Sequence, residues 1–524
     1  MISPQLYNVL NKAWKSTCKI LLGDEVGELK DFEEWVGEYM PPIGKRKSYL
    51  SGKDVALVSP HYCESAHFIS SEEIKERTVD PLTINEIKDI DSIAQAVAEK
   101  WEYAGNRVQG NSMLVESSDI AIDSQYVTDS TNITESQYVL SSFMMRNGSK
   151  YSFGSGWSAK AEFTIRHIGG FDVKRLLESH VVTASSDIYF SYNLGGCMDA
   201  MFCFNVRNKR HCIGNLELPR EKYSALKAKL LAEVRGRLKK DKKFLSLMDM
   251  APENGPAKGS LGVKESPEKT SMEPIRKAFS SVFKVIFKAE PEDMEKYEKW
   301  MMKTIPPIKD IVSPFGRKTF FPDDKAFSCL SKLPRNRTVS FAEVMELGKK
   351  RMKESDLGSL ETITKGLSEI AFFSLELIEG TVSNAIKSPL VYQASNIYRV
   401  YDATYTEYAG MGSLNLNSKY TFGCYRIVES QFCLKCHNSL HINRCFEVDT
   451  SSNCLDSLFC HNSEGLADAM FCFNVKGKRH AIGNTQLEPG KYKAIKDSLV
   501  EQIVSELEKK KSLKWDIYNI GCAK

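Results

Sequence analysis

The stretch DAMFCFNVRNKRHCIGN, residues 199–215, occurs a second time as DAMFCFNVKGKRHAIGN at residues 468–484, with fourteen of seventeen positions identical. It is the best-preserved part of a longer internal match. Trp35 aligns with Trp300, and Tyr223 aligns with Tyr492, at offsets of about 265 to 269 residues. The sequence therefore predicts that the chain is a tandem duplication.

Composition divides the chain into two halves joined by a tether. Residues 250–274 are rich in Pro, Gly, Ser, Lys and Glu, a composition that cannot bury a core and that predicts a flexible linker. Before the linker we expect the N-terminal helical region of copy 1 (1–111) and its β-rich core with a cap helix (112–249). After it we expect the helical region of copy 2 (275–387) and its β-rich core with a cap helix (388–524).

Bulky side chains recur every 12 or 13 residues in the middle of each half. They are Tyr126, Tyr138, Tyr151, Phe163, Leu176, Tyr189 and Phe202, and then Tyr408, Tyr420, Phe432, Cys445, Leu458 and Phe471. Short β-rich segments separated by turn residues at a fixed period are typical of a solenoid. We expect two such steps to make one coil. An antiparallel β-sandwich is the alternative, since its strands recur at a similar spacing.

The predicted fold class is thus α+β. Each half is expected to be a helical region followed by a β-solenoid core, similar to a parallel β-helix, and a C-terminal capping helix. In the repeated stretch both faces of the strand DAMFCFNV are apolar, so this strand should be covered on both sides. The residues NKRH or GKRH are expected to form a turn and IGN a short strand, and the following helix is expected to form a lid. On this interpretation the repeat is structural.

A functional interpretation of the repeat depends on its two charged triplets. Basic residues and an imidazole at matching places are suited to holding a phosphate, a nucleic-acid backbone or an acidic partner surface. The candidate partner- or anion-binding residues are Lys209, Arg210, His211, Lys478, Arg479 and His480.

The repeated phrase resembles the C-terminal signature of an uncharacterised family of Cys-rich β-solenoid proteins of archaea and candidate-phylum bacteria. In that family a strand rich in Cys and Phe leads to an N-K-x-Y/H-x-I-x-N turn and a helix containing Tyr. The match covers residues 124–235 and 408–507. The resemblance implies the solenoid fold, and it implies no mechanism because the family has no established activity. The family's dense cysteine ladder is thin in the first half of this chain.

Most of the fourteen cysteines lie in the second half, where a C-x2-C pair suits a metal half-site. The candidate ligands of a zinc or iron–sulfur centre are Cys433, Cys436, His441 and Cys445. The first half argues against this prediction, because Thr164 aligns with Cys433 and Leu176 aligns with Cys445. Replacement by small or apolar residues favours thiols that serve as compact filler inside narrow coils. No other cofactor is indicated.

The composition is that of a soluble globular protein, with 42% hydrophobic residues, 26% charged residues and a formal net charge of +4. No apolar run has the length of a membrane span, and the N-terminus lacks the pattern of a secretory signal. We therefore expect a cytoplasmic protein that has no membrane contact and whose thiols are mostly reduced.

The sequence favours a non-catalytic role over an enzyme, because no phosphate-binding loop or catalytic motif is legible. The expected function is that of a scaffold or assembly protein, which presents duplicated surfaces to a protein partner or to itself. One alternative is binding of RNA or a ribonucleoprotein through the two KRH turns and the basic cap helix. A further alternative is metal or iron–sulfur handling by the Cys-rich second half.

Overall fold

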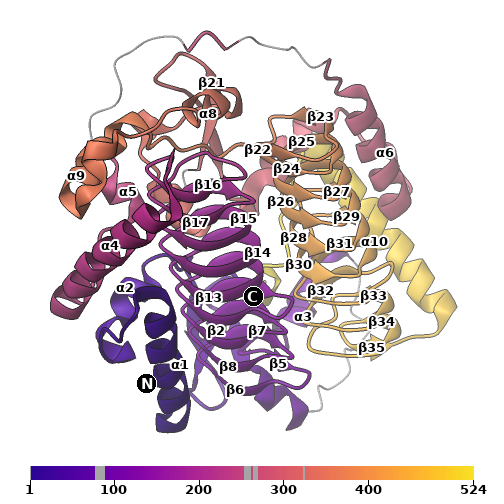
Figure 1. Cartoon of the computed structure of the whole chain (residues 1–524). Coiled ribbons are helices and arrows are strands. Elements are labelled where there is room, and N and C mark those ends of the chain that lie inside the picture. Colours follow the sequence, from indigo (N-terminus) through magenta and orange to yellow (C-terminus); the bar gives the residue numbers. More distant parts are fainter. Residues whose placement is uncertain (1, 77–88, 253–260, 264–268, 323–324, 524) are drawn as a thin grey trace.

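The computed structural model describes residues 2–76, 89–252, 261–263, 269–322 and 325–523. Two large β stacks lie side by side, with helices on their outer sides (Figure 1). The first stack runs from β5 (Val108–Gln109) to β19 (Leu216–Glu217), and the second runs from β22 (Leu377–Glu379) to β35 (Thr485–Gln486). Within each stack the strands pair in parallel, and each stack ends in a short antiparallel hairpin. The chain is α+β, as the sequence predicts.

The strands between these ends are short. In the first stack they are β6 (Met113–Glu116), β7 (Asp119–Ile122), β8 (Gln125–Thr128), β9 (Thr131–Thr134), β10 (Gln137–Leu140), β11 (Phe143–Arg146), β12 (Lys150–Phe153), β13 (Gly156–Ile165), β14 (Ile168–Leu177), β15 (His180–Tyr189), β16 (Tyr192–Gly195), β17 (Met198–Met201) and β18 (Arg210–Ile213). In the second stack they are β23 (Ser383–Ile386), β24 (Leu390–Tyr392), β25 (Ser395–Thr404), β26 (Glu407–Leu416), β27 (Lys419–Phe422), β28 (Tyr425–Val428), β29 (Gln431–Leu434), β30 (His437–Leu440), β31 (Asn443–Asp449), β32 (Leu458–His461), β33 (Ala467–Met470) and β34 (Arg479–Ile482).

Residues twelve positions apart lie side by side in both stacks. Val127 of β8 pairs with Val139 of β10, and Cys433 of β29 pairs with Cys445 of β31. The intervening strands pair in the same way in a second row, as β7 does with β9. One step of twelve residues therefore completes a coil, and the expectation of two steps per coil is wrong. Residues that follow one another at this step are called a column below.

Left-handed backbone conformations accompany this short return. From Leu114 to Met144 every third residue has a φ between 46° and 61°. Such a conformation costs an L-amino acid about 1 kcal/mol or more, and the hydrogen bonds between neighbouring strands offset that cost. Each of these residues bends the chain, which is how two short strands fit within twelve residues.

Small hydrogen-bonding side chains fill the inside of each stack. Ser124 Oγ donates to the carbonyl two residues earlier at 2.8 Å and accepts a hydrogen bond from the Ser136 amide at 3.1 Å. In the second stack thiols share this role with serines, and Cys433 Sγ donates to the carbonyl two residues earlier at 3.2 Å. These cysteines are buried among apolar residues inside the stack. Their placement agrees with the prediction of compact interior filler.

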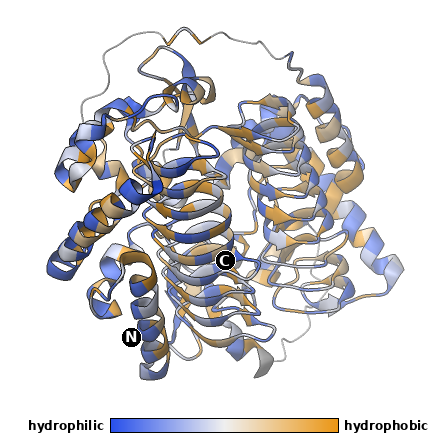
Figure 2. Cartoon of the chain, viewed as in Figure 1, coloured by the Kyte–Doolittle hydropathy of each residue, from blue (hydrophilic) through white to orange (hydrophobic). Residues whose placement is uncertain are grey.

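Two pairs of helices flank the stacks on opposite outer sides (Figure 1). Helix α1 (Pro4–Leu22) lies along the first stack, and α4 (Arg220–Asp241) contacts β18 near the end of that stack. Helices α6 (Glu273–Phe287) and α10 (Pro489–Lys510) contact the second stack in the same manner. Figure 2 shows hydrophilic and hydrophobic residues interleaved along the strands and along these helices. Within the described ranges no helix combines the length and the hydropathy needed to cross a membrane.

Two further segments each contain strands and a helix. The first exchange segment, the described part of residues 44–105, contains β1 (Gly44–Lys47), β2 (Asp54–Leu57), β3 (His67–Ser70), α3 (Ile90–Ala98) and β4 (Glu102–Gly105). The second exchange segment, the described part of residues 308–376, contains β20 (Ile308–Val312), β21 (Lys318–Pro322), α8 (Phe341–Leu347) and α9 (Leu360–Gly366). The regions 1–111 and 275–387, which were expected to be helical, therefore contain strands as well.

The first exchange segment packs on the second stack. The Trp101 ring lies 5.0 Å from the Phe473 ring, and the Ala104 amide donates to His461 Nε2 at 3.1 Å. Both stack residues are buried. A segment from the N-terminal half thus covers the end of the C-terminal stack.

The second exchange segment packs on the first stack in the reciprocal way. The Phe373 ring lies 5.7 Å from the Phe204 ring, and the Tyr192 hydroxyl donates to the Ser374 carbonyl at 2.6 Å. Phe204 lies 269 residues before Phe473 in the sequence. The two halves therefore hold each other through matching positions.

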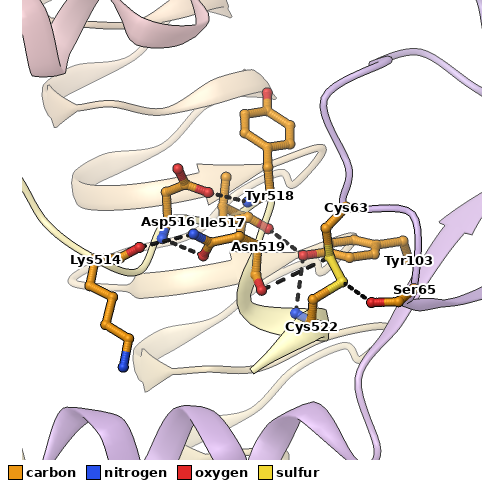
Figure 3. Close-up of a disulfide and its surroundings, with 10 residues drawn as sticks. Cys63, Ser65, Tyr103, Lys514, Asp516, Ile517, Tyr518, Asn519 and Cys522 are labelled. Carbon is orange, nitrogen blue, oxygen red and sulfur yellow. Dashed lines mark hydrogen bonds between the residues drawn. A yellow bond between two sulfur atoms is a disulfide. The ribbon is translucent and has the colours of Figure 1, made fainter. Parts of the chain in front are cut away.

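A disulfide also joins the two halves. Cys63 of the first exchange segment is bonded to Cys522 near the C-terminus (Figure 3). Beside it, the Tyr103 hydroxyl donates to the Ile517 carbonyl at 2.8 Å. The other cysteines are free and buried. The prediction of mostly reduced thiols omitted this pair.

The predicted linker, residues 250–274, falls largely outside the described residues, which omit 253–260 and 264–268. At its start the Pro252 carbonyl accepts a hydrogen bond from Arg337 Nε at 3.0 Å. Its last residues belong to α6.

Candidate functional site

The first charged triplet does not form a turn. Arg210 and His211 belong to β18, so the predicted turn is wrong there. Lys209 precedes the strand, and its Nζ lies 2.6 Å from Glu217 Oε2. Arg210 is exposed, whereas the half-buried His211 ring lies 5.6 Å from the Tyr223 ring of α4. The three side chains therefore have different neighbours.

The second triplet is arranged in the same way. Lys478 precedes β34, and Arg479 and His480 lie in that strand. The His480 ring is 5.7 Å from the Tyr492 ring of α10. In both stacks the histidine contacts the tyrosine of the lid helix, while the arginine faces solvent.

A column of polar residues leads to His211 along the first stack. Arg175 Nε and Nη2 donate to the two carboxylate oxygens of Asp187 at 2.8 and 2.6 Å. One step further, Asp199 Oδ1 accepts a hydrogen bond from Lys227 Nζ of α4 at 3.0 Å. His211 follows after one more step. The first polar strip consists of Arg175, Asp187, Asp199, His211, Tyr223 and Lys227.

The second stack carries a matching strip. Arg444 Nε and Nη2 donate to the carboxylate of Asp456, each at 2.7 Å. Asp468 accepts a hydrogen bond from Lys496 Nζ of α10 at 3.2 Å, and His480 Nε2 lies 4.0 Å from its other oxygen. The second polar strip consists of Arg444, Asp456, Asp468, His480, Tyr492 and Lys496.

The two strips agree in residue type at every one of their positions, although the surface beside them does not. The adjacent column contains Lys174, Ser186 and Met198 in the first stack, and Asn443, Leu455 and Ala467 in the second. Interior positions have diverged as well, since Leu176 matches Cys445. Retained residues thus include half-exposed polar side chains of the strips as well as the buried apolar residues of the repeated stretch.

The first strip ends in a shallow hollow of about 410 Å³ between the stack and α4. Asp199, His211, Tyr223 and Lys227 line it, together with Arg220 at the start of the helix. Lys227 Nζ also lies over the Tyr223 ring, 5.7 Å from its centroid. The hollow therefore combines an acid, an imidazole, a phenol and two cationic groups.

The phenols of the two lid helices share the same environment. Tyr223 and Tyr492 are each 2% exposed, and neither hydroxyl has a hydrogen-bond partner among the residues that the structure describes. Burial raises the pKa of both phenols well above the ordinary value, so each remains protonated. A buried hydroxyl without a partner costs about 1 to 3 kcal/mol.

Two basic residues of the first cap helix are engaged within the molecule. Arg235 Nη1 donates to the Leu22 carbonyl at 2.8 Å, and Lys239 Nζ lies 2.6 Å from Asp24 Oδ2. These contacts fasten α4 to the end of α1. They leave fewer charges for an RNA backbone than the sequence indicated.

The structure does not bring the four candidate metal ligands together. Cys433, Cys436 and Cys445 lie inside the second stack, whereas the half-exposed His441 is hydrogen-bonded to Glu429 at 2.9 Å. Burial raises the pKa of Cys433 to about 11, so its thiol stays protonated. Metals bind the thiolate. Over the described ranges, no group of three or more His, Cys, Asp or Glu side chains is placed to hold a metal.

A buried Cys, His and Glu arrangement lies under the second exchange segment. Cys329 Sγ is 3.7 Å from His180 Nδ1, and His180 Nε2 is 3.3 Å from Glu178 Oε1. All three side chains are inaccessible to solvent. Burial raises the pKa of Cys329 well above its ordinary value. The sulfur is therefore a neutral thiol, and Glu178 serves mainly as the partner of Arg166, 2.5 Å away.

Sequence reasoning found the histidines of the strips but missed their polar neighbours. The tyrosine match was visible in the sequence, and the twelve-residue step would have aligned Asp187 and Asp199 with His211. Comparisons of the chain with protein families, with curated proteins and with solved structures find no match. The resemblance to the Cys-rich β-solenoid family accordingly stays a prediction.

Proposed function

We propose that the protein is a binding scaffold, built by tandem duplication from two β-solenoids with twelve-residue coils. Its function is to present the same polar strip twice to a protein partner or to a second copy of itself. The observation that carries the proposal is the retention of Arg175, Asp187 and Asp199 as Arg444, Asp456 and Asp468 while neighbouring positions changed.

The contrast between the strips and their surroundings supports recognition rather than packing. If only the fold constrained the sequence, interior positions should be retained at least as well as half-exposed ones, because core substitutions cost the most. Leu176 and Cys445 show that part of the interior tolerates change, whereas Phe202–Phe204 is retained as Phe471–Phe473. Exposed polar residues that are retained are accounted for more directly by contact with a partner.

Reciprocal closure of the stacks also supports a scaffold. The exchange segments fix the two stacks relative to each other, so both strips belong to one body. A partner that engages both strips gains affinity through effective concentration. RNA binding receives less support, because Arg235 and Lys239 are engaged with the α1 region.

The test is affinity capture from native lysate, followed by native mass spectrometry of the captured complex. We expect one protein partner, or the chain itself, at a defined stoichiometry. Charge reversal in both strips, Arg175→Glu with Arg444→Glu, should abolish capture. The matched control, Lys174→Glu with Lys419→Glu, reverses exposed charges beside the strips and should preserve it. A monomer without a stoichiometric partner, or capture that survives the strip variant, would contradict the proposal.

A further inference from the structure

The hollow at the end of the first strip runs along the side of α4 from Arg220 to Leu231, and the second strip ends at the matching place beside α10. Helices α4 and α10 begin after Pro219 and Glu488, and neither residue caps its helix with a side-chain hydrogen bond. The first amide groups of such a helix point outward with a partial positive charge, which favours an anion. The geometry by itself does not make a site, and two further features are needed.

The first feature is the unsatisfied phenol. Tyr223 lines the hollow, and its buried hydroxyl has no partner among the described residues. Tyr492 is in the same state at the matching position. One such hydroxyl is a small defect of packing, but the same defect in both halves indicates a donor that is kept for a ligand. A bound acceptor atom would satisfy it.

The second feature is an unpaired cation that is kept in both halves at different positions. Within the strip, Lys227 is neutralised by its aspartate. Arg220 lines the first hollow and forms no ion pair with a described residue. In the second half Pro489 takes the place of Arg220, while Lys493 takes the place of Ser224 and likewise forms no ion pair within the described residues. The excess positive charge is thus retained although its position has moved.

We infer that the first hollow and the matching place at the end of the second strip each bind an oxyanion, a phosphate or carboxylate group that the partner offers. The tyrosine hydroxyl, the imidazole and the unpaired cation are its donors. This inference rests on the proposed function, because both places form part of the polar strips. The chain accordingly carries two oxyanion sites, one centred on His211 and Tyr223 and the other on His480 and Tyr492.

Histidine imidazole NMR tests the inference directly on the full chain. Inorganic phosphate is added to ¹⁵N-histidine-labelled protein at constant pH and ionic strength, with sodium acetate in a second arm and sodium chloride as the reference. The resonances of His211 and His480 should shift and saturate, whereas those of the buried His167 and His437 should stay in place. Saturation by phosphate alone identifies a phosphoryl group, and saturation by acetate as well identifies carboxylates.

Single substitutions assign each site. Arg220→Ala should weaken the response of His211 about tenfold and leave His480 unchanged, because it removes one charge-assisted hydrogen bond. Lys493→Ala should do the reverse. Lys229→Ala removes an exposed cation from α4 away from the hollow and should change neither response. Tyr223→Phe retains the ring, and should weaken binding at the first site.

The outcomes separate this inference from the scaffold role. Responses that do not saturate, that equal those to chloride, or that ignore Arg220→Ala and Lys493→Ala would overturn the oxyanion sites. If these sites fail while capture still depends on Arg175 and Arg444, the scaffold role stands. If phosphate binds as described but no stoichiometric partner is captured, the sites stand and the scaffold role fails.

Discussion

Asn205 and Asn474 make the same hydrogen bond in opposite directions across the molecule. Asn205 Nδ2 donates to the Phe372 carbonyl at 2.9 Å, and Asn474 Nδ2 donates to the Glu102 carbonyl at 3.2 Å. Each bond joins one stack to the exchange segment of the other half. The pair shows that the closure of the two stacks is reciprocal at the level of single atoms.

Removing either amide should weaken this closure. Asn205→Ala and Asn474→Ala each leave a carbonyl without its partner, so the free energy of unfolding should fall by roughly 1 to 3 kcal/mol in denaturant titrations. Asn208→Ala is the matched control. Asn208 is exposed, and its φ of 55° is close to the φ of 60° at Asn205. Alanine therefore carries a similar backbone penalty at both positions. Equal losses in Asn205→Ala and Asn208→Ala would show that the amide bond contributes nothing.

Glu447 and Glu178 occupy matching positions in the two stacks. Their carboxyl groups should make the free energy of unfolding depend on pH in opposite directions. Burial raises the pKa of Glu447 to about 7, with Lys435 Nζ 3.5 Å away. At Glu178, where Arg166 lies 2.5 Å away, burial acts in the same direction but the guanidinium outweighs it and holds the pKa at about 2.

The signs follow from an unfolded pKa of about 4.5. The contribution of Glu447 is complete below pH 4.5 and declines as the pH rises toward 7, because the folded state retains the proton. The contribution of Glu178 is complete above pH 4.5 and is lost as the pH falls toward 2. Glu447→Gln should therefore flatten the unfolding free energy between pH 4.5 and 7, and Glu178→Gln should not. An unchanged profile in Glu447→Gln would contradict the raised pKa.

Acid should destabilise the stacks through their buried imidazoles. Burial lowers the pKa of His167 and of His437 to about 3. Since the unfolded chain takes up protons below about pH 6.5, the stability contributed by the neutral rings declines as the pH falls from 6.5 to 3.

The other half of the chain provides the replacement for this experiment. Ile168 occupies the position that matches His437, so His437→Ile should fit the stack and reduce the loss of unfolding free energy between pH 6.5 and 4. A His437→Ile profile identical to that of the wild type would exclude this residue as a source of acid sensitivity.

Much of the fold could be predicted from the sequence, and the site only in part. The period, the parallel β-rich cores and the interior cysteines follow from local patterns. The sequence prediction places Leu176, 13 positions after Phe163, next in the row of bulky residues. In the structure Leu176 lies in the interior, and Arg175, 12 positions after Phe163, is the next member of the column. The exchange of segments could not be predicted, because it depends on packing between residues far apart in sequence, such as Trp101 and Phe473.

The disulfide should stabilise the chain although the fold does not require it. Cys63→Ser removes the link between the first exchange segment and the C-terminal residues, and we expect a loss of about 2 to 4 kcal/mol in unfolding free energy. Thermal unfolding of the variant and of the reduced wild type should coincide, because the other thiols are free and buried in both. If reductant lowers the unfolding free energy of Cys63→Ser further, the chain contains another disulfide.

The interior thiols should be replaceable by hydroxyl groups. Cys433 Sγ makes the hydrogen bond that Ser124 makes in the first stack, so Cys433→Ser should cost less than about 1.5 kcal/mol. Cys433→Val, which lacks the donor, should cost more. Elemental analysis should show the same content of zinc and iron in the wild type and in Cys433→Ser. Stoichiometric metal in the wild type that is lost in the variant would restore the metal hypothesis.

Reciprocal closure has a consequence for synthesis on the ribosome. The lid helix of the first stack emerges soon after its strands, but Phe373, which packs on Phe204, is translated only after α6 and α8. The nascent N-terminal half therefore keeps one apolar edge of its stack exposed until the second exchange segment has been synthesised. Slow translation beyond α4 should expose that edge to chaperones, whereas the C-terminal stack finds its cover already made.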